Sequence, residues 1–175
     1  MKKLHLLLLS LLLTLLTSCG FHLRGDTPLA PALQTVYIKT KTPYSDFTEN
    51  LEQYLKMSKV TVVNTPQLAT TIIEILSETS SQQLLGVNNT QLTRQYNLIL
   101  SINFQITDPK GMVLVPQQTV TETRTLAINA NQILAGSNES TALLQDMRRA
   151  IVFDVMNVLS SKMVNFRLKN IGAPQ

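Results

Sequence analysis

The clearest pattern in the chain is the alternation of apolar and polar residues between positions 92 and 106. One set is apolar and consists of Leu92, Tyr96, Leu98, Leu100, Ile102, Phe104 and Ile106. The intervening set is polar and uncharged and consists of Gln95, Asn97, Ser101, Asn103 and Gln105, with only Ile99 out of place. Successive side chains of a strand point to opposite faces of a sheet. The pattern therefore predicts a long antiparallel strand with one buried face and one polar face.

Other runs rich in β-branched residues predict three further strands, at residues 36–39, 70–79 and 112–128. The tetrapeptide Asp108-Pro109-Lys110-Gly111 has the composition of a turn and precedes the last of these strands. Pro116 interrupts that strand and predicts a bulge or an edge position, because proline cannot donate a ladder hydrogen bond. Residues 80–90 contain Gly86 and two adjacent asparagines, so a loop is expected there.

The second of these short strands carries two carboxylates. The alternation places Ile73 and Ile75 on one face and Glu74 and Glu78 on the other, although Ile72 and Leu76 do not fit it. Residues four apart on a strand are separated by about 13 Å, which is too far for a carboxylate pair that acts on one bond. The two glutamates are therefore interpreted as solvated strand charges.

Two helices are predicted from apolar residues at helical spacing. The first covers residues 46–57, with Ser45 or Asp46 as its N-cap. The second is a long last helix that begins at Ser137 or Asn138 after a loop at 129–137. Its expected buried stripe is Leu144, Met147, Ile151, Val155, Val158, Leu159, Met163 and Phe166, widened by Val152, Phe153 and Met156.

The order of these elements is strand, helix, strand, strand, strand, helix. A crossover from strand through helix to strand makes the first two strands parallel, and the two hairpins that follow are antiparallel. The predicted fold class is α+β, a two-layer sandwich with two helices packed on one face of a four-stranded mixed sheet. A single domain is expected over residues 35–170, with residues 171–175 as a tail.

The N-terminus has the features of a secretory signal. Two lysines precede an apolar run from Leu4 to Leu16, which is shorter than the ~20 residues that a membrane-spanning helix needs. The sequence Leu16-Thr17-Ser18-Cys19 resembles the bacterial lipobox. This predicts a signal peptide at 1–18, cleavage between Ser18 and Cys19, and lipid on the sulfur and the amine of Cys19. The alternative is an ordinary signal peptide followed by a chance cysteine.

Residues 19–34 are expected to form an extended, lipidated tether because they contain two prolines and two glycines. Phe21 and Leu23 are too apolar for a simple spacer. Together with Arg24, they are expected to dock on a partner or near the lipid surface.

Composition narrows the function further. The formal net charge is +4, part of which belongs to the signal, and the chain has no Lys/Arg-rich run and no Trp. Nucleic acid is therefore not expected as a partner. Cys19 is the one cysteine, and His22 is the one histidine that remains after residue 18. Neither a zinc site nor a Ser-His or Cys-His mechanism can be built from these residues, so no enzyme, metal or cofactor is expected.

Several motifs carry a resemblance to a known family. The first is Cys19-Gly20-Phe21-His22-Leu23-Arg24-Gly25, and the second is Arg94-Gln95-Tyr96-Asn97-Leu98 at the start of the long strand. Further motifs follow in order: Asp108 to Gly111, Arg124, Glu139 and Asp146-Met147. In these residues the chain resembles the LPS-assembly lipoprotein family, LptE, over its whole mature length.

The resemblance implies a lipoprotein of the outer membrane that lies as a plug inside the β-barrel of LptD. The two proteins would form the translocon that places lipopolysaccharide in the outer leaflet. Candidates for docking to the barrel are Phe21, Leu23, Arg24, Gln95, Asn97 and Asn103. Candidates for binding lipopolysaccharide phosphates are Arg94, Arg124 and Lys110 near strand ends, with Arg148 and Arg149 on the last helix. The alternative function is a stand-alone lipoprotein that binds or carries a lipid or small hydrophobic ligand, which would need an apolar cavity.

Overall fold

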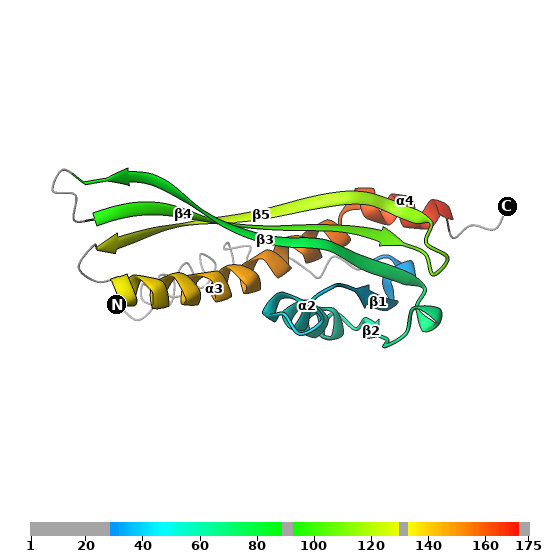
Figure 1. Ribbon diagram of the computed structural model, residues 1–175. Coiled ribbons are helices and arrows are strands. Elements are labelled where there is room, and N and C mark those ends of the chain that lie inside the picture. The colour runs from blue at the N-terminus through cyan, green and yellow to red at the C-terminus, as the bar shows by residue number, and fades with distance from the viewer. Residues whose placement is uncertain (1–28, 89–92, 130–132, 172–175) are drawn as a thin grey trace, which may run out of the picture.

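The computed structural model describes residues 29–88, 93–129 and 133–171. It contains one mixed sheet with helices packed on one face, which confirms the predicted α+β class (Figure 1). The strand order is β2-β1-β3-β4-β5. The strands are β1 (Thr35–Lys39), β2 (Thr61–Val62), β3 (Thr71–Val87), β4 (Thr93–Thr107) and β5 (Val113–Asn129). As predicted, β1 pairs in parallel with β3, and β3, β4 and β5 pair antiparallel.

Three α-helices and two short 3-10 turns complete the described part of the chain. They are α2 (Asp46–Met57), α3 (Ile133–Leu159), α4 (Lys162–Ile171), η1 (Pro31–Leu33) and η2 (Pro66–Leu68). No helix in the described ranges combines the length and the apolar character needed to cross a bilayer.

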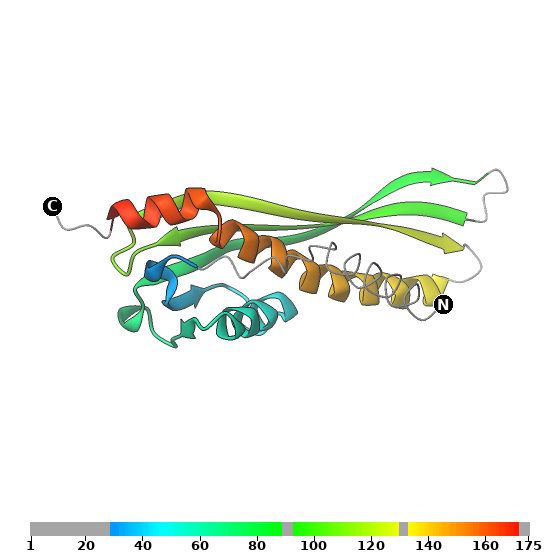
Figure 2. The same cartoon turned by 180° about the vertical axis from the view of Figure 1, so that it is seen from behind.

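The molecule is elongated because β3, β4 and β5 are much longer than β1 and β2 (Figures 1 and 2). We call the end with the β4–β5 turn the proximal end and the end where β3 leads into β4 the distal end. The elements β1, β2, α2 and α4 all lie in the proximal half. Of the helices that the structure describes, only α3 runs along the sheet in the distal half.

The core forms where the apolar face of β4 meets the helices. Its contributors from β4 are Leu98, Leu100, Ile102, Phe104 and Ile106, as the alternating pattern predicts. Across the layer, α3 contributes Met147, Ile151, Val152, Val155 and Leu159, and α2 contributes Phe47, Leu51 and Leu55. These side chains belong to one contiguous buried cluster, so burial of apolar surface holds the two layers together.

The sheet has five strands and not the predicted four. The β-branched run after α2 forms a two-residue edge strand, β2, because it lies parallel to β1 in the register Thr35↔Thr61. The third strand is also longer than expected. The predicted loop at 80–90 is wrong up to Val87, because antiparallel pairing with β4 continues through the polar residues Ser80–Gln83.

The last helix is two helices. Helix α3 ends at Leu159, and α4 starts anew at Lys162, where the hydroxyl of Ser161 accepts a hydrogen bond from the amide of Val164 (3.3 Å). The interruption changes the helical phase. Val164 and Leu168 are therefore buried. The predicted core residues Met163 and Phe166 are instead 43% and 67% exposed.

Two further boundaries differ from the predictions. Helix α3 begins at Ile133 and passes through Gly136, where a Cβ atom would lie 2.6 Å from Cγ2 of Ile128, so glycine permits the close approach to β5. The expected tether also ends early. Pro31–Leu33 form η1, and Leu33 is buried in the core.

Other local predictions are confirmed. Helix α2 has the expected bounds, and Ser45 is its N-cap, accepting a hydrogen bond from the amide of Thr48 (3.2 Å). The register of β4 and β5 shifts between Phe104 and Ile106, which places a bulge beside Pro116. Strand β5 is also an edge of the sheet, as proline at this position suggested.

Candidate functional site

The face of the sheet that points away from the helices carries an array of uncharged polar side chains. We call it the polar face. It consists of Ser77, Thr79, Ser81, Gln83, Gln95, Asn97, Ser101, Asn103, Thr119, Thr121, Thr123 and Thr125. Their alignment follows from the strand registers, which pair Ser101 with Thr121 and Asn97 with Thr125. The hydroxyls of Ser101 and Thr121 lie 3.0 Å apart, and Thr125 donates to the Oδ1 atom of Asn97 (3.0 Å).

Asn103 is the centre of this array. Its Nδ2 atom donates to the hydroxyl of Ser77 on β3 (2.8 Å). Its Oδ1 atom accepts from the hydroxyl of Thr119 (2.6 Å) and from Nε2 of Gln117 (3.3 Å) on β5. One amide thus connects three strands, and it fixes the orientation of hydroxyls that are available to a partner. Two of the predicted docking residues, Asn97 and Asn103, therefore lie on this face, and Gln95 lies further along it towards the distal end.

The proximal end of the polar face carries one ion pair. The Nζ atom of Lys39 lies 2.7 Å from Oε1 of Glu74, and Nε2 of Gln105 donates to Oε2 of Glu74 (2.8 Å). These hydrogen bonds, that of Lys39 first, hold the pKa of Glu74 below its ordinary value of 4.5. Glu74 is thus ionised at neutral pH, and its charge is matched locally.

Arg94 and Arg124 lie on the opposite face, the one that carries the helices. The register places Arg94 opposite Ile128 and Arg124 opposite Leu98. A rise of ~3.4 Å per residue and a strand spacing of ~4.8 Å put their Cα atoms about 14 Å apart. Both side chains are exposed, and Nη2 of Arg124 lies 2.6 Å from Oε1 of Glu122. The structure therefore places both arginines in the distal half of the sheet, on adjacent strands.

Lys110 lies far from these arginines. It is exposed in the turn between β4 and β5, where Oδ1 of Asp108 accepts hydrogen bonds from the amides of Lys110 (2.9 Å) and Met112 (2.7 Å). Gly111 adopts a φ of 89°, which favours glycine in this turn. Roughly 45 Å of strand separate Lys110 from Arg94. Arg94, Arg124 and Lys110 thus do not form one site, and the other two candidates, Arg148 and Arg149, lie on α3.

The prediction for Glu78 is wrong, because this residue lies on the helix face. The register shifts between Ile75 and Ser77, so Leu76 is an extra residue and the alternation reverses after it. Glu78 then pairs with Ile102, whose side chain is in the core. The misfit of Leu76 in the sequence pattern was the signal of this bulge.

Glu78 takes part in an ionic cluster that sequence reasoning missed. The Nε atom of Arg148 on α3 lies 2.8 Å from Oε1 of Glu78, and Nη1 lies 3.8 Å from Oδ2 of Asp46 at the start of α2. The side chains of Arg148 and Glu78 are only 25% and 16% exposed. This cluster therefore connects β3, α2 and α3 at the point where α2 begins.

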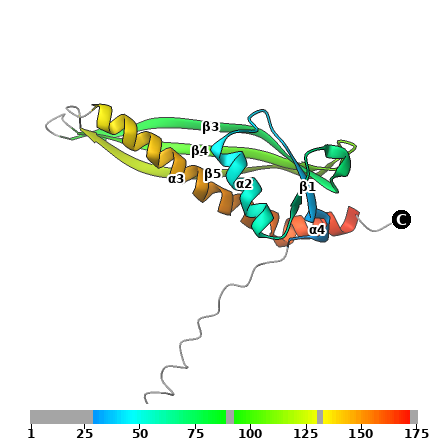
Figure 3. The ribbon, with the colours of Figure 1, turned by 90° about the horizontal axis from the view of Figure 1, so that it is seen from below.

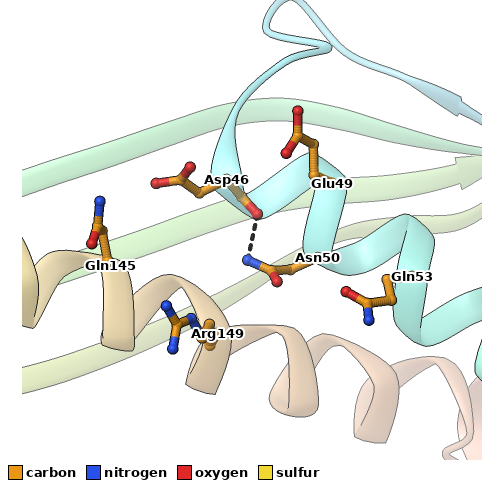
Figure 4. Close-up of a pocket in the computed structure, with 6 residues that line it drawn as sticks. All are labelled: Asp46, Glu49, Asn50, Gln53, Gln145 and Arg149. Atoms are coloured by element: carbon orange, nitrogen blue, oxygen red, sulfur yellow. Dashed lines mark hydrogen bonds between the residues drawn. The ribbon is translucent and has the colours of Figure 1, made fainter.

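Beside this cluster, a polar groove lies between α2 and α3 (Figure 4). It has a volume of about 280 Å³ and is lined by Asp46, Glu49, Asn50, Gln53, Gln145 and Arg149. Figure 4 shows Nδ2 of Asn50 directed at the carbonyl of Asp46, to which it donates (2.6 Å). The lining offers hydrogen bonds and charge. Among the residues that the structure describes, no cluster of three or more His, Cys, Asp or Glu could hold a metal ion.

Apolar side chains are exposed at both ends of the sheet. At the distal end they are Leu84, Leu85 and Val87, where the register shifts again between Leu84 and Gly86. At the proximal end they include Leu68, Met112, Val113, Met163 and Phe166. The remaining predicted site residues, Ser18, Cys19, Phe21, Leu23 and Arg24, lie outside the described residues.

Comparison with known proteins gives one family. Residues 33–159 match the family model described as "LptE: Lipopolysaccharide-assembly". A relative from Yersinia enterocolitica named LPS-assembly lipoprotein LptE is 31% identical, with 83% of this chain and 70% of the relative covered. A relative of the same name from Pectobacterium atrosepticum is 27% identical, with 98% of this chain and 95% of the relative covered.

Solved structures show the same fold. Lipoprotein B from Nitrosomonas europaea superposes with a TM-score of 0.68 at 23% identity, over 89% of this chain and 99% of that one. Rare lipoprotein B from Shewanella oneidensis gives a TM-score of 0.64 at 17% identity, over 75% and 98%. The family model covers well over half of the chain, and both solved structures superpose on most of it. The chain therefore belongs to the LptE family of lipopolysaccharide-assembly proteins.

Proposed function

We propose that this protein is a lipid-anchored component of the lipopolysaccharide translocon of the outer membrane. In this proposal it lies in the lumen of an LptD-type β-barrel, assists the assembly of that barrel and binds lipopolysaccharide. The observation that carries the proposal is the polar face of the sheet, which combines a broad array of hydroxyls and amides with a dry core on its other side.

Such a face suits the wall of a large barrel. The lumen of a large outer-membrane barrel is polar and wet. Hydroxyls and amides can exchange water for barrel side chains without the desolvation cost of burying a net charge. Asn103 holds its neighbours in place through three hydrogen bonds. Contact with a partner would therefore cost less side-chain entropy than contact through free side chains.

The alternative, a stand-alone carrier of a lipid or small hydrophobic molecule, needs an apolar cavity. In the described residues, the space between the sheet and the helices is filled by one contiguous core. The groove between α2 and α3 is lined by charged and amide side chains. These observations favour the barrel partner.

The first prediction tests the polar face directly. A photo-crosslinking residue at Thr121 or Thr123, on the polar face, is expected to capture a large outer-membrane barrel in living cells. Matched substitutions at Gln53 and Gln145, which are exposed on the helix layer, are expected to give weaker capture. Crosslinked products are identified by mass spectrometry. Capture of only soluble periplasmic proteins, or capture from the helix layer alone, would contradict the proposal.

The second prediction concerns lipopolysaccharide. Its phosphates favour guanidinium groups because these form bidentate, charge-assisted hydrogen bonds. Arg94 and Arg124 are the pair that the fold places on one face, about 14 Å apart. Arg94→Gln with Arg124→Gln is expected to weaken lipopolysaccharide binding by roughly ten-fold or more, given ~1.5–3 kcal/mol for a hydrogen bond to a charged group.

Binding is measured with the purified protein at several salt concentrations. The loss should shrink as salt rises, because screening already weakens the wild-type contact. The matched control is Lys41→Gln with Lys56→Gln, which removes the same charge from exposed positions on other elements. Equal effects of the two double variants would exclude the arginine pair as a specific site.

A further inference from the structure

Helix α4 presents an unusual surface to solvent. Its inward stripe consists of Val164 and Leu168, which are buried in the core. Its outward stripe contains two large apolar side chains, Met163 and Phe166, one turn apart. A phenyl ring with two thirds of its surface in water finds no partner in the described part of the protein, and it lacks the neighbours that a core position would give it.

Cations surround these apolar groups. Lys162, Arg167 and Lys169 are all exposed, and the sequence of α4 contains no Asp or Glu. Within the described residues, none of these three cations forms an ion pair, although six ion pairs occur elsewhere. An exposed aromatic ring flanked by lysines and arginines is the composition of a helix that lies on an anionic lipid surface.

The position of α4 in the molecule also favours contact with a lipid surface. In Figures 2 and 3, α4 lies beside η1 at the proximal end, close to where the described chain begins at Leu29. Both elements contribute to the same core, through Leu33 and Val164. At full extension, the ten residue steps from Cys19 to Leu29 reach ~35 Å at most. A lipid on Cys19 therefore restricts α4 to the neighbourhood of the membrane.

Further apolar groups are exposed at this end. Met112 and Val113, in the β4–β5 turn and at the start of β5, are about half exposed. This turn lies at the same end of the molecule as α4 (Figures 1 and 2). The proximal end thus offers exposed apolar groups on two elements, and both carry basic residues, Lys110 in the turn and Lys162, Arg167 and Lys169 on α4.

We infer that α4 is a second membrane contact, which places Phe166 and Met163 among the headgroups of an anionic phospholipid surface while Lys162, Arg167 and Lys169 contact phosphate. The inference rests on the lipid anchor of the proposed function, but it does not require the barrel. The contact orients the domain relative to the bilayer, which a lipid on Cys19 alone does not do.

The chain has no Trp, so one substitution provides a specific reporter. Phe166→Trp is made in the full, lipidated protein, which is reconstituted into nanodiscs of phosphatidylcholine with or without phosphatidylglycerol. In the anionic discs, we expect a blue shift of Trp emission and strong quenching by brominated acyl chains. In neutral discs, both effects should be much smaller. The matched control is Leu84→Trp, an exposed apolar position at the distal end, which should give neither effect.

Charge is tested in the Phe166→Trp background. Arg167→Gln with Lys169→Gln should remove most of the quenching, whereas Lys41→Gln with Lys56→Gln should leave it unchanged. Quenching that is equal in neutral and anionic discs, absent from both, or dependent on added lipopolysaccharide would overturn the inference.

Mass spectrometry of the same sample separates this inference from the proposed function. An unmodified Cys19 would reject the lipid anchor. The Trp emission would then be measured again with anionic vesicles, and an unshifted spectrum there would reject the role of α4. A lipidated Cys19 with an unshifted Phe166→Trp spectrum rejects α4 alone.

Discussion

Replacement of Phe104 by alanine is expected to lower the free energy of unfolding by about 3–5 kcal/mol. Phe104 is fully buried on β4, between its strand neighbours Ile75 on β3 and Gln118 on β5. The substitution removes apolar burial and leaves a cavity that the surrounding strands cannot close. Urea-induced unfolding, followed by circular dichroism, measures the change as a lower midpoint with an unchanged slope.

The matched control is Phe153→Ala, the same chemical change on α3. Phe153 is 54% exposed and makes an edge-on ring contact with Tyr54 at a centroid distance of 4.7 Å. An aromatic pair of this kind contributes about 0.5–1.5 kcal/mol. The Phe104 variant should therefore be destabilised by at least twice as much. Equal losses would mean that β4 does not form the centre of the core.

Arg148→Met is expected to cost about 2–3 kcal/mol, somewhat less than the loss for a fully buried pair. The substitution keeps most of the side-chain volume but leaves Glu78, which is 16% exposed, without its cation. Asp46 also loses its longer contact of 3.8 Å, so the junction of α2, α3 and β3 is weakened as a whole.

Two comparisons isolate this effect. Arg149→Met removes the neighbouring arginine, which is 64% exposed and lies 3.7 Å from Asp146, and should change stability by less than about 0.5 kcal/mol. Arg148→Met with Glu78→Met replaces the pair by apolar groups and should recover most of the loss. Equal stabilities of the Arg148 and Arg149 variants would show that the cluster contributes nothing beyond a surface ion pair.

Much of the fold could be predicted because its signals are local. The alternation along β4 has one exception, Ile99, and this strand lies between two partners, so the pattern gives the correct faces. Helix α2 combines a cap, Ser45, with apolar residues at helical spacing, and its bounds match the prediction. Elements of this kind depend little on distant parts of the chain.

The predictions fail where pairing with a distant part of the chain decides which structure a segment adopts. Ser80–Gln83 have no strand pattern of their own and extend β3 only because β4 lies beside them. The two-residue strand β2 exists through its register with β1. The break between α3 and α4 has a local signal, the pair Ser160-Ser161, but apolar residues on both sides of it suggested one continuous helix. That single error placed Met163 and Phe166 in the core.

The candidate site was predictable to a similar extent. Asn97 and Asn103 lie on the polar face because the alternation fixes the side of β4 on which they point. The role of Asn103 as a connection between three strands required the register, which the sequence does not contain. Arg148 was a candidate for lipopolysaccharide, but its ion pair with Glu78 was not predicted, because Glu78 changes face through the bulge at Leu76.

The uneven coverage of the sheet has a consequence for how the molecule opens. Three helices and five strands stabilise the proximal half, whereas the distal half relies on one helix against three strands. Local unfolding is cheapest where few apolar contacts are broken. We therefore expect the distal ends of β3 and β4 to separate from the first turns of α3 while the remainder stays folded. Such an opening would let the hairpin adjust its shape to a surface that it meets, at a cost well below that of global unfolding.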